Sequence, residues 1–570
     1  MKQLVECVPN ISEGRDHGII DAVTAAVREV AGVALLDVDP GRDTNRTVIT
    51  FVGAPDAVAE AAFRLVARAA QLIDMARHRG AHPRHGATDV VPFVPLQGVT
   101  MTDCVALARR VGERIGAELG IPVYLYEEAA LREERRNLAH CRQGEYEALP
   151  EKLGQSQWTP DFGPDAWSSA VARTGATNVG ARQFLVAYNV NLNTRSKRLA
   201  SDIALDVREG GRAKRDAEGR IVKGPDGQNV MVPGALRAVK AVGWLIPEYN
   251  RAQISMNLVN VSITQPHEAF DEVCQQAVRR GLRVTGSELV GLIPLQSMLA
   301  AGRHYLRRAG ESAGVPQRQL VETAIQSLGL RDLGPFEPAQ KIIELRAGLD
   351  DGRLVKMTNR EFVDELSADS PAPGGGSVAA LCGAQAAALG AMVCNLTVAK
   401  KGYETVQEKV KELAESCQAD KDFFLGAIDE DTEAFNRVMD AMRLPKASPE
   451  QQRERDLALA AATREATRVP LAVLERTLAL LARVGEIARI GNQNSLSDAG
   501  VAALAAHAAA EGAYYNVLIN LGALAALDQS AEPAFAASAR DRAEAALAAA
   551  GETAAVVRAA VRAGLAPTPA

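Results

Sequence analysis

Three of the eight histidines in this chain of 570 residues fall within one short segment, residues 78–89, which reads HRGAHPRHGATD. His78 and His82 have the spacing of a zinc-binding pair on a helix. Gly80 and Pro83 disfavour that helix, because proline restricts the residue before it to extended conformations. We therefore interpret the segment as a substrate-binding loop without a metal, in which a neutral imidazole takes or gives a proton near pH 7.

The same segment carries two arginines, Arg79 and Arg84, which are expected to pair with the carboxylates of a substrate. A basic loop exposed to solvent, with no chemical role, is the alternative interpretation. The spacing alone does not decide which of the three histidines acts.

Two further polar segments of the N-terminal half border predicted strands. One places Asp39, Asn45 and Arg46 in a turn between two apolar runs, where they can reach a ligand, although a plain hairpin connection is the simpler interpretation. The other is the loop 159–165, TPDFGPD, whose free backbone donors suit a polar ligand. Neither pattern alone distinguishes a binding site from an ordinary loop.

The C-terminal half has its own candidate, a run of three glycines at 374–376 followed by Ser377. Glycines before a helix let backbone N–H groups converge at its N-terminus, where an anion is favoured. The run lacks the lysine of a phosphate-binding Walker A loop and does not follow a strand. A flexible start to an ordinary helix is equally consistent with it.

An acidic run in a helical pattern is the second candidate of that half. Asp429 and Glu433 lie four residues apart, and Asp431 points elsewhere around the helix. Because Phe435 and Met439 supply an apolar stripe beside them, we expect one carboxyl to be partly buried with a raised pKa, as general acid–base catalysis requires. A solvated acidic face is the alternative.

The elements that must position these residues change in type along the chain. Up to about Leu330, β-branched runs alternate with helical patterns, which indicates an α/β or α+β region of two subdomains. Strands are predicted at 33–37, 47–52, 90–94, 123–126, 184–188 and 255–259, and helices at 56–75 and 103–120. The glycine-rich, basic segment 210–234 is predicted to be an exposed hairpin or loop.

Alanine-rich helical patterns dominate the last third of the chain. They cover 406–443, 450–485 and 499–526, and they predict an all-α bundle. We therefore predict domains at 1–179, 180–330 and 358–570, with a linker at 331–357.

The composition excludes several classes of function. A formal net charge of −6 and only 4% aromatic residues argue against nucleic-acid binding. Seven scattered cysteines without a CxxC pair indicate neither a zinc ribbon nor a disulfide framework. The most apolar stretch, 378–398, is rich in Ala and Gly and contains Gln385 and Asn395, so we expect a buried helix and no membrane partner. The N-terminus has no apolar signal region, and we expect a cytoplasmic protein.

With these motifs the chain resembles the bifunctional formimidoyltransferase-cyclodeaminase family, the folate enzymes of histidine degradation. The matching segments follow in order over nearly the whole chain. They are LVECVPNISEG at 4–14, TNRT at 44–47, HRGAHPR at 78–84, DFGP at 161–164, GAR at 180–182, APGGGS at 372–377, DED at 429–431, RLPK at 443–446 and AYYNVLIN at 513–520.

The resemblance implies a first reaction in which the formimidoyl group of N-formimidoyl-L-glutamate moves to N5 of tetrahydrofolate. His82 is then the catalytic base. The folate site is expected in the loop that begins with Gly163, Pro164 and Asp165, a loop a few residues longer here than in the family pattern. The resemblance also favours Asp39, Asn45 and Arg46 of the polar turn as pocket residues.

The second implied reaction closes a ring: N10 attacks the formimidoyl carbon, ammonia leaves, and 5,10-methenyltetrahydrofolate results. Asp431 matches the active-site acid of the family and would shuttle a proton to the departing ammonia. Gly375, Gly376, Ser377 and Asp429 are expected near that site from their positions alone.

The resemblance further implies two ferredoxin-like subdomains of βαβ type, followed by a helical domain that dimerises, so the expected fold class is α+β and the expected assembly a homo-oligomer built on dimers. The folate is expected to be polyglutamylated. We hypothesise that the basic residues at 210–223 attract its glutamate tail. Two alternatives stay open. Only one half is catalytic, or the chain is a folate-binding assembly protein without catalysis.

Overall fold

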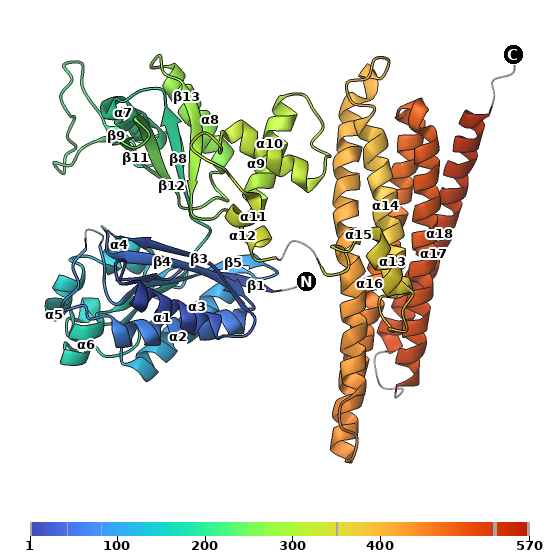
Figure 1. Ribbon diagram of the computed structural model, residues 1–570, viewed down its shortest axis with the longest axis horizontal. Coiled ribbons are helices and arrows are strands. Elements are labelled where there is room, and N and C mark those ends of the chain that lie inside the picture. Colours follow the sequence, from blue (N-terminus) through green and yellow to red (C-terminus); the bar gives the residue numbers. More distant parts are fainter. Residues whose placement is uncertain (1–2, 43, 81–82, 349–351, 528–532, 567–570) are drawn as a thin grey trace. The chain divides into compact units, whose positions relative to one another are not determined.

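The computed structural model describes residues 3–42, 44–80, 83–348, 352–527 and 533–566 (Figure 1). It divides the chain into two compact units. The sheet unit comprises Met1–Met298 and Leu328–Gly348, and the helical unit comprises Leu299–Ser327 and Leu349–Ala570.

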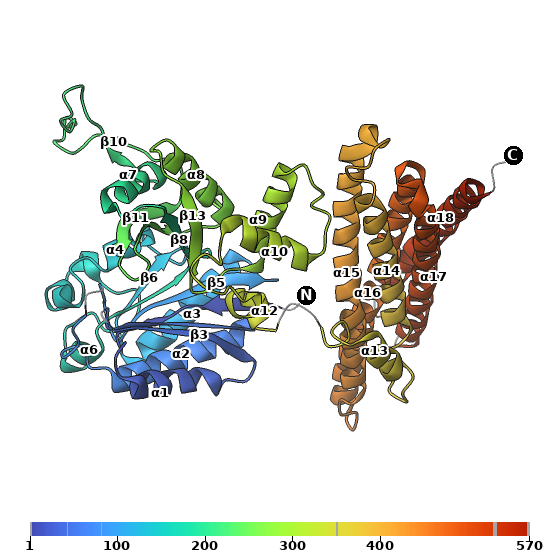
Figure 2. The same cartoon turned by 45° about the horizontal axis from the view of Figure 1, so that its top comes forward.

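The first sheet of the sheet unit is a mixed sheet with helices on one face. Its strands run in the order β3 (Val33–Gly41), β4 (Arg46–Gly53), β1 (Leu4–Cys7) with β2 (Asn10–Ile11), β5 (Thr88–Gln97), β7 (Thr177–Ala181) and β6 (Val123–Glu127). Helices α1 (His17–Arg28), α2 (Pro55–Leu72) and α3 (Met101–Leu119) pack on one face over a common apolar core (Figure 2). Strands β5, β6 and β7 are parallel, and the other pairs are antiparallel.

The second sheet repeats this plan in antiparallel form. Its order is β11 (Val239–Ile246), β12 (Arg251–Leu258), β8 (Val186–Leu192) and β13 (Val284–Val290), with α7 (Lys197–Val207) and α8 (Pro266–Val278) in the connections. In both sheets the chain passes through strand, helix, two strands, helix and strand, which is the ferredoxin-like order. The predicted α+β class is therefore confirmed.

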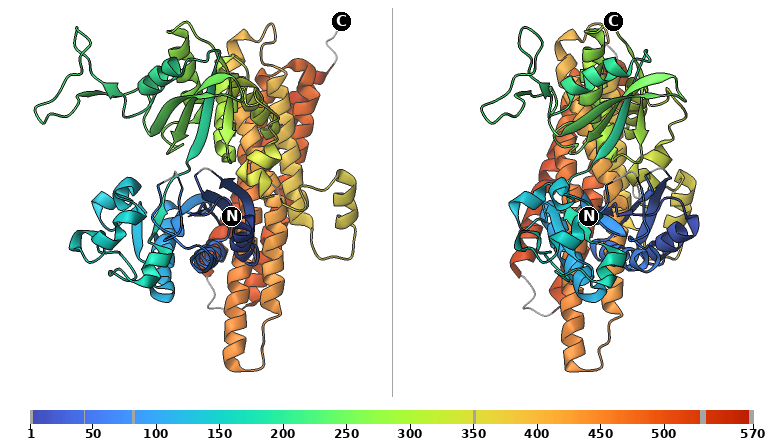
Figure 3. Two further views of the ribbon diagram at one scale, coloured as in Figure 1. Left: turned by 60° about the vertical axis from the view of Figure 1, so that its left-hand side comes forward. Right: turned by 90° about the vertical axis from the view of Figure 1, so that its left-hand side faces the viewer.

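Short elements complete the sheet unit. They are η1 (Glu133–Arg136), α4 (Leu138–Cys141), η2 (Tyr146–Ala148), α5 (Leu149–Lys152), η3 (Ser156–Trp158), α6 (Ser169–Thr174), α11 (Pro338–Lys341) and α12 (Ile343–Arg346). The predicted hairpin is also present: β9 (Arg212–Ala213) pairs with β10 (Met231–Val232), and the segment extends away from the second sheet (Figure 3).

The helical unit is a bundle packed through small side chains. Its helices are α9 (Leu295–Arg308), α10 (Gln317–Leu328), α13 (Asn359–Leu366), α14 (Gly375–Asn395), α15 (Gln407–Met442), α16 (Pro449–Ile490), α17 (Leu496–Ala526) and α18 (Pro533–Leu565), with the short turns η4 (Glu404–Val406) and η5 (Gln493–Ser495). Buried alanines fill the contacts between α14, α15 and α17. Among the helices that the structure describes, α14 alone is long and apolar enough to cross a membrane, and 61% of its most apolar window is buried.

The units differ from the predicted domains at two points. The boundary between residues 179 and 180 falls inside β7, so the first sheet continues to Ala181. Residues 299–327, which we expected in the second subdomain, belong to the helical unit. Gly314 is buried against Ala414 of α15, and its carbonyl accepts a hydrogen bond from Asn395 at 2.8 Å. An apolar helical pattern looks the same whichever unit buries it, so the sequence carries no sign of this grouping.

Candidate active sites

The turn between β3 and β4 anchors the start of the histidine segment. Asn45 adopts a left-handed conformation with φ 48°. Its Oδ1 accepts a hydrogen bond from the Gly14 N–H at 3.0 Å, and its Nδ2 donates to the Arg79 carbonyl at 2.9 Å. A Cβ atom at Gly80 would lie 2.2 Å from the Thr44 carbonyl oxygen, so only glycine fits there. We expected Asn45 to face a ligand. Its side chain instead links the turn between β3 and β4 to Gly14 and to Arg79.

His78 and Arg84 bond to one another within the histidine segment. The Nε2–H of His78 donates to the Asn45 carbonyl at 2.9 Å, and its Nδ1 accepts from Arg84 Nε at 3.2 Å. These partners fix a neutral imidazole with the proton on Nε2. Burial lowers the pKa of His78, which keeps it neutral. Arg84 also pairs with Glu147 at 2.6 Å and Glu145 at 3.3 Å, so the carboxylates that it binds are the protein's own.

His85 is held inside the sheet unit. Its side chain is fully buried, and its Nδ1 lies 3.4 Å from Asn178 Oδ1. Burial lowers the pKa of His85 to about 3. His78 and His85 are thus both buried and neutral, and neither is placed to exchange protons with a substrate. The remaining histidine of the segment, His82, lies outside the described residues.

A buried ion pair lies at the end of β5 nearest the histidine segment. Asp89 is 1% exposed, accepts the backbone N–H of His85 at 3.0 Å and pairs with Arg142. Arg46 lies within electrostatic range of Asp89 and Asp39, while burial lowers the pKa of its guanidinium. Neither residue was predicted to have a role, although Asp89 ends the histidine segment. An aspartate at the start of an otherwise apolar strand was the signal that could have found the first of them.

The predicted folate loop is fastened at its start. Gly163 has φ 82°, and a Cβ atom there would lie 2.3 Å from the Ile121 carbonyl oxygen. Just before it, Asp161 accepts the Leu125 N–H at 2.7 Å and pairs with the buried Arg135 at 2.7 Å. These contacts fix the loop beside the start of β6.

The loop's outer residues and the histidine segment share one end of the sheet. Asp165 is exposed and Pro164 is half-buried. The parallel register places Val90 of β5 and Tyr124 of β6 on either side of Asn178 in β7, so the segments that precede β5 and β6 enter the sheet at the same end. Gly163 of the predicted loop lies against Ile121, just before β6, and the histidine segment leads into β5. The loop and the histidine segment therefore lie at the same end of these parallel strands.

Glu6 on β1 is a buried acid that the sequence reasoning also missed. It is 4% exposed, and burial raises its pKa to about 7, although Arg182 opposes the rise. The alternation of β1 puts Val5 and Cys7 into the core beneath the helices. Glu6 therefore lies on the opposite face of the sheet.

We expect a Glu6→Gln variant to resist the loss of stability that the wild type shows as the pH rises. The buried carboxyl binds its proton more tightly in the folded chain, so its contribution is present below about pH 4.5 and is lost as the pH rises through about 7. The difference in unfolding free energy amounts to about 2–3 kcal/mol at pH 8. Thermal unfolding of both proteins at pH 5 and pH 8 measures it. Equal pH dependence of the two proteins would contradict the buried, protonated Glu6.

In the helical unit, Asp431 of α15 lies against the N-terminus of α14. Its Oδ2 is 3.3 Å from Ser377 Oγ, whose main acceptor is the Ile428 carbonyl at 2.8 Å. A Cβ atom at Gly376 would lie 2.1 Å from Asp431 Oδ1. Burial raises the pKa of Asp431, and its hydrogen bonds to Ser377 oppose the rise. The prediction that one carboxyl of the acidic run is partly buried with a raised pKa is confirmed.

Two neighbours complete the surroundings of Asp431. Gly375 lies beside α17, where a Cβ atom would be 3.3 Å from Asn516 Nδ2. Asp429, expected to bind substrate, instead accepts the backbone N–H of Leu354 at 2.9 Å and of Val355 at 3.2 Å. The glycine run and Asp431 therefore form one site, and Asp429 has a structural role beside it.

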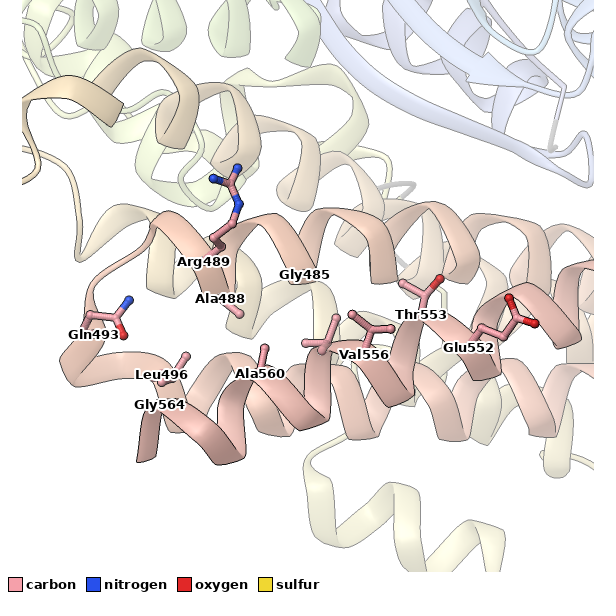
Figure 4. Close-up of a pocket in the computed structure, with 11 residues that line it drawn as sticks. Gly485, Ala488, Arg489, Gln493, Leu496, Glu552, Thr553, Val556, Ala560 and Gly564 are labelled. Carbon is pink, nitrogen blue, oxygen red and sulfur yellow. The ribbon is translucent and has the colours of Figure 1, made fainter. Parts of the chain in front are cut away.

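A groove between α16 and α18 lies elsewhere in the helical unit (Figure 4). It measures about 620 Å³ and is lined by Gly485, Ala488, Arg489, Gln493, Leu496, Glu552, Thr553, Val556, Val557, Ala560 and Gly564. Gly491, just before the residues of its rim, packs on Val393, whereas Asp431 packs on Gly376. These two contact points on α14 are about 25 Å apart along the helix, so the groove is not part of the Asp431 site.

The family models match the chain in three consecutive stretches. Residues 4–182 match the N-terminal subdomain of the formiminotransferase domain, and residues 187–347 match the formiminotransferase domain. Residues 358–545 match the model described as formiminotransferase-cyclodeaminase.

Curated proteins are similar to the whole chain or to either half. Formimidoyltransferase-cyclodeaminase of Sus scrofa is 44% identical over 91% of this chain and 93% of its own length. Glutamate formimidoyltransferase of Streptococcus pyogenes serotype M1 is 40% identical over 54% of this chain and 94% of its own length. Methenyltetrahydrofolate cyclohydrolase of Methylorubrum extorquens is 40% identical over 29% of this chain and 78% of its own length. The chain belongs to the formimidoyltransferase-cyclodeaminase family.

Proposed function

We propose that the chain transfers the formimidoyl group of N-formimidoyl-L-glutamate to N5 of tetrahydrofolate and then cyclises the product to 5,10-methenyltetrahydrofolate with release of ammonia. The observation that carries the proposal is the pairing of two sites in one chain. The half-buried Asp431 lies against Gly376, where a Cβ atom would be 2.1 Å from its Oδ1, and the histidine segment is held by the bond from Asn45 to Arg79 and by its own bond from Arg84 to His78. Similarity to a formimidoyltransferase-cyclodeaminase over 91% of the chain supports both activities together.

In the transfer step, N5 of the folate attacks the formimidoyl carbon while His82 removes the N5 proton. The tetrahedral intermediate then collapses, its bond to the glutamate nitrogen breaks, and the proton passes to the leaving amine. His82 is assigned from the resemblance of the HRGAHPR segment to the family, and the burial of His78 and His85 supports that choice. The exposed Arg79 is proposed to bind a glutamate carboxylate, since Arg84 is already paired.

In the cyclisation step, N10 attacks the formimidoyl carbon of the protonated amidine. Asp431 takes the proton from N10 and delivers it to the departing nitrogen, which leaves as ammonia with the pair of electrons of the broken bond. A carboxyl with a raised pKa suits both halves of this transfer. The N-terminus of α14 supplies Ser377 to hold the carboxyl in place.

A Gly376→Ala variant is expected to lose most of the ammonia release and to keep transfer. The new methyl group would lie 2.1 Å from Asp431 Oδ1, so it must displace the carboxyl. A displacement of about 1 Å can cost about 100-fold in rate. A matched control is Gly426→Ala on α15, where a Cβ atom meets nothing within 4 Å. Ammonia release at wild-type rate from Gly376→Ala would show that the carboxyl is not held there.

The folate is proposed to carry a polyglutamate tail, and the reaction is proposed to need no metal. On the hairpin, Arg212 and Arg220 already pair with protein carboxylates. The attraction for the glutamate tail therefore rests on the exposed Lys214, Arg215 and Lys223.

The absence of a metal is proposed from the bonding of His78. Both of its ring nitrogens take part in hydrogen bonds within the protein, so His78 cannot serve with His82 as a pair of zinc ligands.

We propose a homo-oligomer built on dimers of the helical unit. On α17, Val501, Leu504, Tyr515 and Ile519 are between 50% and 69% exposed at helical spacing. Met392 on the neighbouring α14 and Leu396 just after that helix are also exposed. An apolar stripe of this kind is typical of a protein interface, and a second copy would cover it.

The seven cysteines are free in the structure, which fits a reducing compartment. We therefore propose a cytoplasmic enzyme of histidine degradation and one-carbon metabolism that acts on small molecules.

Two separate assays test the proposal against its alternatives. Formimidoylglutamate with tetrahydrofolate measures glutamate release, and supplied 5-formimidoyltetrahydrofolate measures ammonia release. Activity in both assays is the expected result. Activity in one alone would leave a single catalytic half, and tight folate binding with neither activity would indicate an assembly protein.

A further inference from the structure

The segment just after the sheet unit is bound to the helix that carries Asp431. The carboxylate of Asp429 accepts two consecutive backbone N–H groups, from Leu354 at 2.9 Å to Oδ1 and from Val355 at 3.2 Å to Oδ2. Gly352 lies so close that a Cβ atom there would be 2.1 Å from the Asp429 Cγ. We call this arrangement of Asp429 with Gly352, Leu354 and Val355 the linker clamp.

The linker clamp and the Asp431 site hold opposite sides of one helix turn. Residues two apart on a helix point about 200° from one another. Asp431 faces Gly376 and Ser377 of α14, whereas Asp429 faces the incoming segment. The Leu354 side chain is 3% exposed and belongs to the core of the helical unit. The segment is therefore packed as part of this unit, although we predicted it as linker and the family matches end at 347 and resume at 358.

We propose that residues 352–357 form the first element of the deaminase site, and that Asp429 is a positioning residue that fixes the rotation of α15 and so the place of Asp431. A carboxylate that receives two charge-assisted hydrogen bonds is a strong tie between segments. It supplements the bond from Ser377 to the Ile428 carbonyl and the core packing of Ala427 and Ile428, which hold the same turn of α15. The activity readouts of this inference rest on the proposed cyclisation, and a proteolysis readout does not.

The first test replaces Asp429 by asparagine, which keeps the shape but places an amide donor opposite one of the two N–H groups. Ammonia release from supplied 5-formimidoyltetrahydrofolate should fall about 10- to 100-fold in kcat. KM and formimidoyl transfer should stay unchanged. The matched control is Asp440→Asn on the same helix, where the side chain is 72% exposed and pairs with Arg443. Equal kcat values in Asp429→Asn and Asp440→Asn would overturn the positioning role.

The second test is a double-mutant cycle with Gly352→Ala. In the wild-type background the new methyl group collides with the Asp429 carboxyl and should lower kcat for cyclisation. In an Asp429→Ala background the collision is gone, so Gly352→Ala should cost nothing further. This non-additivity is the signature of direct contact. Costs that add in the double variant would contradict the contact.

The third test follows tryptic cleavage after Arg353, whose side chain is 66% exposed. The bond that follows it includes the Leu354 N–H, which the linker clamp holds. Cleavage at this bond should be faster in Asp429→Asn than in the wild type and in Asp440→Asn. Equal rates would overturn the linker clamp whatever the activity. Faster cleavage of Asp429→Asn, together with a wild-type protein that releases no ammonia, would support the linker clamp and reject the proposed cyclisation.

Discussion

Replacing His82 by alanine is expected to lower kcat for formimidoyl transfer by about 10²–10⁴-fold, the usual effect of removing a general base. The same variant should release ammonia from supplied 5-formimidoyltetrahydrofolate at the wild-type rate, because that step uses Asp431 in the other unit. Glutamate release and ammonia release are measured on the same preparation. The assignment rests on the resemblance of the histidine segment to the family, and the burial of His78 and His85 supports it.

The matched control for this variant is His17→Ala. His17 is exposed at the start of α1, so its loss should leave both activities unchanged. Transfer at the wild-type rate in His82→Ala would mean that another group takes the N5 proton. Asp39, whose carboxylate lies within electrostatic range of Arg46, would then be the first acceptor to test.

Replacing Asp431 by asparagine should lower kcat for cyclisation by a similar factor, about 10²–10⁴-fold, and 5-formimidoyltetrahydrofolate should accumulate. The wild-type rate should rise with pH through the raised pKa of Asp431, because only the carboxylate can take the N10 proton. That rise should be absent from the residual activity of the variant. The pH profiles of ammonia release from supplied 5-formimidoyltetrahydrofolate, recorded for the wild type and the variant, test this prediction.

Stability gives an independent control for Asp431→Asn. Burial of the ionised carboxyl is unfavourable above its pKa. The amide should therefore leave the free energy of unfolding at pH 8 unchanged or slightly raised. A Glu433→Gln variant changes an exposed acid on the same helix and should alter neither stability nor ammonia release. Full ammonia release by Asp431→Asn would remove the carboxyl from the mechanism.

Local patterns predicted much of the fold. The run at 47–52 became β4 and the run at 123–126 became β6, because their β-branched and apolar residues suit strands that are mostly buried. β1 and β2 were missed, since Pro9 breaks this strand into pieces too short for a pattern. The grouping of 299–327 with the helical unit depends on contacts with residues about a hundred positions away, which no local pattern carries.

The sites were predictable where chemistry and spacing act within one element. The apolar residues Phe435 and Met439 beside the acidic run predicted a partly buried carboxyl. In the structure this carboxyl is that of Asp431. The partners of Asp429 were not predictable, because they are backbone groups about 75 residues earlier in the chain. Arg84 is a similar case, since the glutamates that neutralise it follow about 60 residues later.

The most direct test of the central claim follows one purified preparation given tetrahydrofolate and N-formimidoyl-L-glutamate together. Methenyltetrahydrofolate and ammonia are recorded over the same time course. We predict that both appear in equal amounts and that neither appears when formimidoylglutamate is omitted. Glutamate release with neither product would leave a transferase beside a silent helical unit, and no release at all would contradict the proposed function.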